Sequence, residues 1–200
     1  MPRLFLAVLA LLLAVPAYAQ GYGGGTPAHG VVRATTQHMY YEVQGRTEHD
    51  LLQAMLRGGP EWEGQRFFGL TTSEVGYSYA KVSAATGCDL AEIVVTSAIT
   101  ITLPRWQPLA GTPYALERDW RRFERALRHH EDGHRRLLEE EAEQIRTVLA
   151  GLRTPTCAAM DAEARREIEH VRRSFATLHR SYDERTDHGR TQGAQWPLGQ

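Results

Sequence analysis

Lysine and cysteine are both scarce in this 200-residue chain, and neither sign of charge dominates. Lys81 is the only lysine among 23 basic residues, and 24 acidic residues leave a formal net charge of −1. The chain has no long run of one sign, so its composition does not indicate nucleic acid or an anionic membrane surface as a partner. We interpret the excess of arginine over lysine as a bias of genomic composition.

Long apolar stretches are also missing, except at the N-terminus. Arg3 precedes the apolar residues 4–15, and Ala17-Tyr18-Ala19 follows in a small-x-small pattern. This order is typical of a secretory signal peptide, and it predicts cleavage near Ala19 and a secreted or periplasmic protein. A membrane-spanning helix needs about 20 apolar residues. No later stretch comes near that length, so we expect a soluble exported protein with no membrane span.

The two cysteines, Cys88 and Cys157, are expected to form one disulfide bond. An exported chain meets an oxidising compartment, where a pair of cysteines is most simply bridged. The alternative is that both bind zinc, but the histidines described below form a better metal site. The bridge would close a loop of about 70 residues and stabilise the fold by roughly 4 kcal/mol as an upper estimate.

The exported part of the chain is predicted to be a flexible segment, residues 20–35, followed by one domain, residues 36–197. A short helix is expected to open at Thr47 or Asp50. β-branched and aromatic residues predict strands, which we expect to pair as a small antiparallel sheet. The predicted strands cover residues 31–44, 75–83 and 88–103.

Two long helices are predicted in the second half of the chain. Thr112-Pro113 opens the first, which runs to about Ala150 and ends at Gly151. A second apolar stripe starts between residues 157 and 161 and reaches Tyr182. The short connection predicts an antiparallel helical hairpin. The expected fold class is therefore α+β, with a small antiparallel sheet packed on a long helical hairpin in a zincin-like arrangement.

The first long helix carries His130-Glu131-Asp132-Gly133-His134, which has the H-E-x-x-H spacing of zinc peptidases. Residues four apart share one face of a helix, so both imidazoles can converge on one metal ion. Both histidines also occupy core-facing positions of the apolar stripe, where an imidazole without a partner is costly. The pattern predicts a Zn²⁺ site with Glu131 as a general base. The alternative is a pair of hydrogen-bonded core histidines.

The second helix predicts where a third ligand would come from. At 1.5 Å per residue, the returning helix brings Tyr182 level with His130. A catalytic zinc ion needs three protein ligands and an open position. His188, just past the helix end, is the predicted third ligand. Asp183 or Asp187 could take that place instead.

These motifs resemble a bacterial family of predicted secreted zinc-dependent proteases known as domain of unknown function 922. The likeness covers roughly residues 36–197, and the combination of the two histidine motifs is its most specific part. The matching positions are Tyr40-Tyr41, Gly45, Cys88, Leu103-Pro104-Arg105-Trp106, His130-Glu131-Asp132-Gly133-His134, Cys157, Tyr182-Asp183, Thr186 and His188-Gly189.

The resemblance implies a metallopeptidase that cleaves a peptide or protein substrate. A zinc ion held by His130, His134 and His188 would activate water, with Glu131 as the general base. Tyr182 is a candidate donor to the oxyanion, and its alternative is a packing role. Two other functions stay open: a non-catalytic metal-binding or partner-binding module of the cell envelope, and an amidase that acts on cell-wall peptide. No role is assigned to the remaining helix histidines, His129, His170 and His179.

Overall fold

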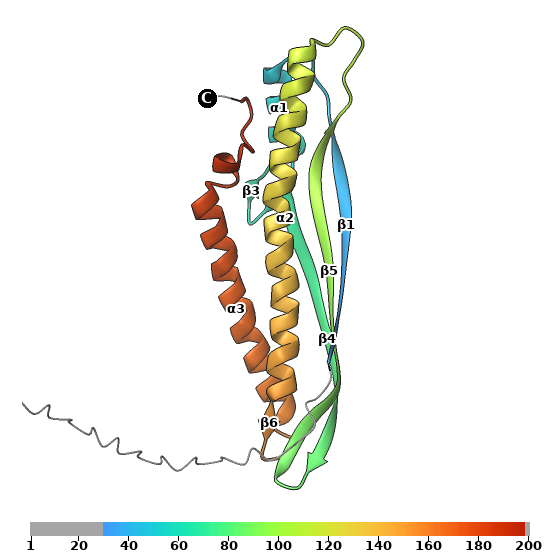
Figure 1. Ribbon diagram of the computed structural model, residues 1–200, viewed down its shortest axis with the longest axis vertical. Helices are drawn as coiled ribbons and strands as arrows, with labels where there is room; N and C mark the ends of the chain where they lie inside the picture. The colour runs from blue at the N-terminus through green and yellow to red at the C-terminus, as the bar shows by residue number, and fades with distance from the viewer. Residues whose placement is uncertain (1–29, 199–200) are drawn as a thin grey trace, which may run out of the picture.

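The computed structural model describes residues 30–198, which form a mixed α/β fold with one main sheet and three α-helices. Figure 1 shows α2 in the centre, with the sheet on one side and α3 on the other. Within the described range, no helix is both long and apolar enough to cross a membrane. The elements, in chain order, are β1 (Val31–Val43), α1 (Glu48–Gly58), β2 (Glu61–Trp62), β3 (Gln65–Arg66), β4 (Leu70–Ala84), β5 (Gly87–Trp106), α2 (Tyr114–Gly151), β6 (Arg153–Thr154), α3 (Met160–Thr186) and the short 3₁₀ helix η1 (Arg190–Gln192).

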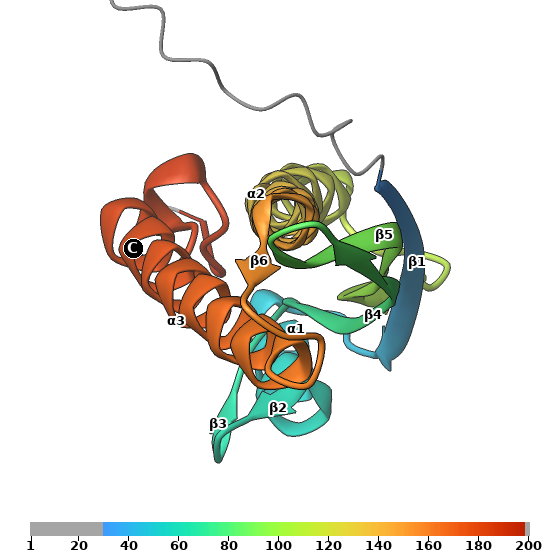
Figure 2. The same cartoon turned by 90° about the horizontal axis from the view of Figure 1, so that it is seen from below.

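The main sheet has the strand order β1-β5-β4, and β6 pairs with the start of β5. β4 and β5 are antiparallel because a two-residue turn after Ala84 joins them. β1 runs parallel to β5, so the expectation of a purely antiparallel sheet is wrong. α1 and β4 lie between β1 and β5 in the chain, and this long connection lets the chain return in the same direction. Figure 2 shows β1 and β4 at opposite edges of the sheet.

The central strand β5 contains a bulge that keeps its apolar side chains on one face. Cys88 and Leu90 are buried, and from Ile93 to Leu103 every second residue is buried as well. The two series are out of phase by one residue. Glu92 has a positive φ of 51°, and the pairing with β4 shifts at the same place. This extra residue turns the second series towards α2.

The helices follow the sequence expectations closely. The Thr47 side chain accepts a hydrogen bond from the Asp50 amide, and the Asp50 side chain caps in return, so α1 begins with a capping box. α2 begins at Tyr114, directly after the predicted start at Thr112-Pro113, and ends at Gly151. α3 begins inside the predicted window and ends four residues beyond Tyr182. A zincin-like architecture stays a prediction.

Two hydrophobic clusters lie along α2. The first cluster includes Trp120 and Phe123 of α2 together with Trp196 from the C-terminal segment. The second cluster includes Ile145 and Leu149 of α2, which pack with α3 and β5. Leu127 before the motif and Leu138 after it both belong to the first cluster, so apolar packing holds α2 in place on both sides of residues 130–134.

The predicted disulfide between Cys88 and Cys157 is confirmed, with Cα atoms 5.0 Å apart and a sequence separation of 69. It ties the start of β5 to the segment before α3. The predicted signal peptide lies outside the described residues, as do residues 20–29 of the flexible segment. Residues 31–35, which were also placed in that segment, belong to β1.

Candidate metal centre

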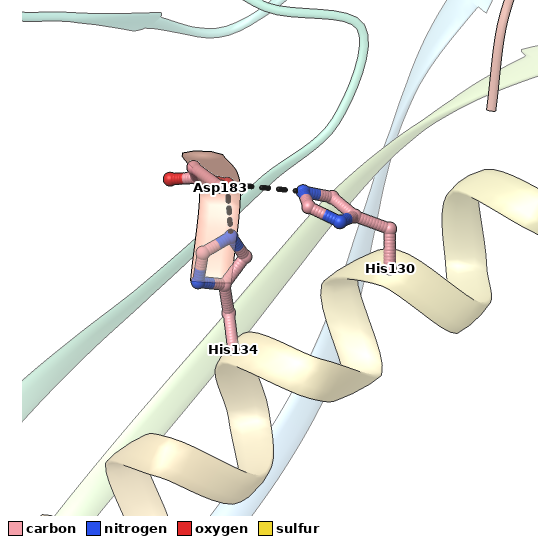
Figure 3. A group of neighbouring side chains, drawn as sticks. All are labelled: His130, His134 and Asp183. Carbon is pink, nitrogen blue, oxygen red and sulfur yellow. Dashed lines mark hydrogen bonds and ion pairs between the residues drawn. The ribbon is translucent and has the colours of Figure 1, made fainter. Parts of the chain in front are cut away.

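Two imidazoles and one carboxylate converge between α2 and α3. His130 Nε2 lies 3.3 Å and His134 Nε2 3.0 Å from the same oxygen, Asp183 Oδ1. Figure 3 shows the two histidines projecting from successive turns of α2 towards the aspartate of α3. The three ligand atoms all lie within 4.8 Å of one another. His130 is buried, and the other two residues are half-buried.

The spacing and chemistry of these atoms fit a zinc ion. Tetrahedral zinc binds nitrogen and oxygen at about 2.0 to 2.2 Å, which places neighbouring donor atoms about 3.3 Å apart. The two distances to Asp183 Oδ1 are close to this value. Two histidines with one carboxylate form a ligand set found in catalytic zinc sites, and three ligands leave a fourth position open.

The charges of the centre favour an ionised aspartate. Burial by itself would raise the pKa of Asp183, but hydrogen bonds from His130 and His134 outweigh it and hold this pKa far below its usual range. Burial likewise opposes a charge on His130, whereas Asp183, Glu131 and Gln192 together raise the pKa of this imidazole. The carboxylate is therefore already in the form that binds a cation.

The predicted third ligand, His188, lies at the rim of this centre. Its Nδ1 atom is 3.9 Å from Asp183 Oδ1, its side chain is 68% exposed, and it does not belong to the converging group. Asp187, the other candidate, forms an ion pair with Arg190. The third donor atom that converges with the two imidazoles is thus an oxygen of Asp183. One helical turn of α3 aims that carboxylate at the histidine pair, whereas His188 follows the helix end and has a positive φ of 50°.

Glu131 is buried on the side of α2 that faces β4. The Glu131 side chain accepts a 2.7 Å hydrogen bond from the Thr71 hydroxyl, and Glu131 is only 3% exposed. Burial raises the pKa of Glu131, while the Thr71 hydrogen bond and the neighbouring histidines lower it. Such a carboxyl group, with a pKa moved towards neutrality, is suited to accept and release a proton.

Tyr182 positions His130 in the structure. The two rings are stacked with centroids 5.1 Å apart, which confirms that Tyr182 is level with His130. The tyrosine hydroxyl donates to the main-chain oxygen of His130 and accepts a hydrogen bond from Gln192 Nε2. The proton of this hydroxyl is therefore engaged in a hydrogen bond within the protein, whereas the predicted role of Tyr182 is to donate it to the oxyanion.

Gln192 of η1 sets the orientation of His130, and the sequence carries no signal for this role. Its Nε2 donates to Tyr182, so its Oε1 faces His130 Nδ1 at 3.1 Å. An amide oxygen accepts, so His130 Nδ1 carries a proton. Nε2 can then release its own proton and offer a lone pair when a metal ion takes the place of the hydrogen bond to Asp183. Hydrogen bonds like the one to Gln192 orient the histidines of metal sites.

A long cleft runs past the centre, between the edge strand β4 and helix α3. The lining residues include both histidines, Glu131 and Asp183, so the cleft borders the centre. Further lining residues come from the β2–β3 hairpin, from β4, from α2, from α3 and from the turn after α3: Trp62, Arg66, Thr71, Ser73, Val75, Leu138, Glu141, Arg172, Ala176, His179 and His188.

A family model described as bacterial protein of unknown function (DUF922) matches residues 38–189. The chain belongs to this family. Both halves of the centre, residues 130–134 and residues 182–189, lie inside the DUF922 segment. The family description assigns no function and names neither zinc nor proteolysis. No curated protein and no solved structure matches the chain.

Proposed function

We propose that this DUF922 protein is an exported zinc-dependent hydrolase, and that it acts as a metallopeptidase. The observation that carries the proposal is the convergence of His130, His134 and Asp183 at the donor spacing of a zinc ion. A buried Glu131 directly follows the first ligand, and the cleft exposes the centre to a substrate. These features match the requirements for metal-assisted hydrolysis.

Each residue then has a definite task. A bound zinc ion would polarise the carbonyl of the scissile bond and lower the pKa of a water molecule. His130, His134 and Asp183 would hold that ion and leave its fourth position open. Glu131 would take a proton from the attacking water and pass it to the leaving amine. Thr71 holds the Glu131 carboxylate in place through its hydroxyl.

The strand that lines the cleft supports an extended peptide as the substrate. β4 is an edge strand, and residues 69–75, which include its first half, line the cleft beside the centre. An edge strand offers main-chain groups to which an extended chain can add by hydrogen bonding. Cell-wall peptides could bind to the same main-chain groups. The alternative function, an amidase that acts on cell-wall peptide, is therefore tested in the same experiment.

The test combines metal analysis with hydrolysis assays on the purified protein. We expect about one zinc ion per chain and turnover of a peptide library or of isolated cell wall. The Glu131→Gln variant should keep its metal and lose activity by roughly 10²- to 10⁴-fold, because only the base is changed. A zinc-loaded parent with no turnover on either substrate would leave the non-catalytic metal-binding module as the better reading. A parent without affinity for zinc would contradict the proposal entirely.

A further inference from the structure

His179 of α3 contacts His134 on the side of the ring opposite Asp183. Its Nδ1 atom lies 2.8 Å from His134 Nδ1, and the two rings lie edge to edge, with centroids 5.1 Å apart and planes 16° from parallel. Asp183 follows four residues later in α3, so the same face of this helix presents both His179 and Asp183 to His134. His134 therefore has one partner from α3 at each of its ring nitrogens.

The short contact between the two Nδ1 atoms leaves room for a single proton. One of the two nitrogens must donate and the other must accept. If His134 Nε2 is to offer a lone pair to a metal ion, the proton of this ring must lie on Nδ1. His179 Nδ1 is then the acceptor, and the proton of His179 lies on its own Nε2.

That Nε2 atom has no hydrogen-bond partner. Among the residues that the structure describes, it is one of two such buried side-chain atoms, and the other is Ser97 Oγ. A buried polar atom without a partner destabilises a fold. An apolar side chain could fill this position without this cost, so packing alone gives no reason for a histidine here. Because Nε2 is inaccessible, His179 is also unable to donate from it to a substrate.

We propose that His179 is a positioning residue of the metal centre. Its Nδ1 accepts the His134 proton, fixes the tautomer of His134 and so directs the His134 Nε2 lone pair towards the ion. This inference rests on the proposed function, because it assumes that the centre holds a metal. With this role, each histidine of the centre has an acceptor for its Nδ1 proton. Gln192 accepts from His130 Nδ1, and His179 accepts from His134 Nδ1.

The experiment compares two substitutions in the full chain, with Co²⁺ as the probe in place of Zn²⁺. His179→Phe keeps an aromatic ring but removes the acceptor. His179→Asn keeps an acceptor oxygen near the position of Nδ1. Co²⁺ affinity is read from the visible absorption during titration, and the melting temperature of the metal-free protein is measured in parallel. His170→Phe, at an exposed position of the same helix, is the matched control.

We expect His179→Phe to weaken Co²⁺ binding by about 10- to 100-fold, as is typical for the hydrogen-bond partner of a metal ligand. His179→Asn should recover most of that loss, and His170→Phe should match the parent. The metal-free His179→Phe protein should melt close to the parent, because it loses the unpartnered Nε2 atom but leaves His134 Nδ1 without its acceptor. This combination would distinguish positioning from packing.

Two results would overturn the inference while leaving the metal centre intact. One is a His179→Phe variant that binds Co²⁺ as tightly as the parent. The other is an equal loss of affinity in His179→Phe and His179→Asn, which would show that the acceptor is not what matters. A parent that binds neither Co²⁺ nor Zn²⁺ would instead overturn the proposed function, and this inference with it.

Discussion

Gly133 and Tyr182 fit against each other so closely that position 133 has no room for a side chain. A Cβ atom built on Gly133 would lie 2.1 Å from the Tyr182 hydroxyl oxygen and 2.3 Å from its Cζ atom. The tyrosine crosses α2 at this glycine to stack on His130 and to donate to its main-chain oxygen. The missing side chain in the H-E-x-x-H motif therefore lets α3 approach α2 at the metal centre.

The Gly133→Ala variant tests this close approach. In an open helix, alanine would be more stable than glycine by about 1 kcal/mol. Here we expect a net loss of about 1 to 3 kcal/mol, because the Tyr182 ring must leave its place against His130. Metal affinity should fall as well. Gly151→Ala is the control, since a Cβ atom at Gly151 in the same helix meets nothing within 4 Å. Equal stability of the two variants in urea unfolding would contradict the contact.

The third metal ligand can be decided by comparing two substitutions. We expect Asp183→Asn to lower zinc affinity by at least about 100-fold, because it removes the charge of a converging ligand. His188→Ala should lower it by less than about tenfold, because His188 is exposed at the rim. Competition titration with a chelator measures both affinities. A larger loss in His188→Ala would restore His188 as the third ligand and would show that the bound state differs from the one described.

Thr71 should tune the acidity of Glu131. Its hydroxyl donates to the Glu131 carboxylate, and this hydrogen bond lowers the pKa of Glu131. Thr71→Val removes the donor, so the pKa of Glu131 should rise further. Since the base works only when deprotonated, the acidic limb of the kcat/KM profile should move to higher pH. A hydrogen bond worth about 1 kcal/mol corresponds to a roughly fivefold loss of activity on that limb. An acidic limb that stays at the same pH in Thr71→Val would argue against Glu131 as the base.

Glu141 is expected to make stability depend on pH. It is 8% exposed in the cleft, and burial raises its pKa above the ordinary value of 4.5, although Arg172 opposes this rise. The folded protein thus holds the proton more tightly than the unfolded chain. The charged form therefore begins to cost stability as the pH rises above about 4.5. Below that pH both states are protonated and the cost disappears.

The Glu141→Gln variant should therefore be more stable than the parent at pH 7, by on the order of 1 kcal/mol. At pH 4 the two proteins should have nearly the same free energy of unfolding. Urea unfolding at both pH values measures the difference. An equal gain at pH 4 and pH 7 would show that the effect comes from packing and not from the charge.

The disulfide should stabilise the fold without shaping the metal centre. Replacing Cys88 and Cys157 together by serine is expected to lower the free energy of unfolding by roughly 2 to 4 kcal/mol, because a long loop is no longer closed in the unfolded chain. Cys157 lies past the far end of α2, and Gly151 is 17 residues or about 25 Å from His134. Zinc affinity should hence be unchanged. Reduction of the parent protein should reproduce the loss, and a reduced protein of full stability would contradict it.

Local patterns were sufficient to predict most of the secondary structure. Apolar periodicity places α2 and α3, the Thr47 and Asp50 pair opens α1, and the two cysteines pair with each other. Such features depend on neighbours in the chain or on a choice with few alternatives. The direction of β1 depends on a partner more than 50 residues away. The β-branched and aromatic residues of β1 favour a strand in either direction, so the direction of β1 could not be predicted from them.

The sequence by itself determined that two imidazoles share one face of a helix, because H-E-x-x-H spacing and the helical repeat are local properties. It also limited the third ligand to Asp183, Asp187 or His188, by the length of the returning helix. Only the tertiary structure brought Asp183, and not Asp187 or His188, into the group that converges with the histidines, and added Gln192 and His179 as partners of the two imidazoles. The choice follows from the rotation of α3 about its own axis and from the turn after it, and packing against α2 sets both.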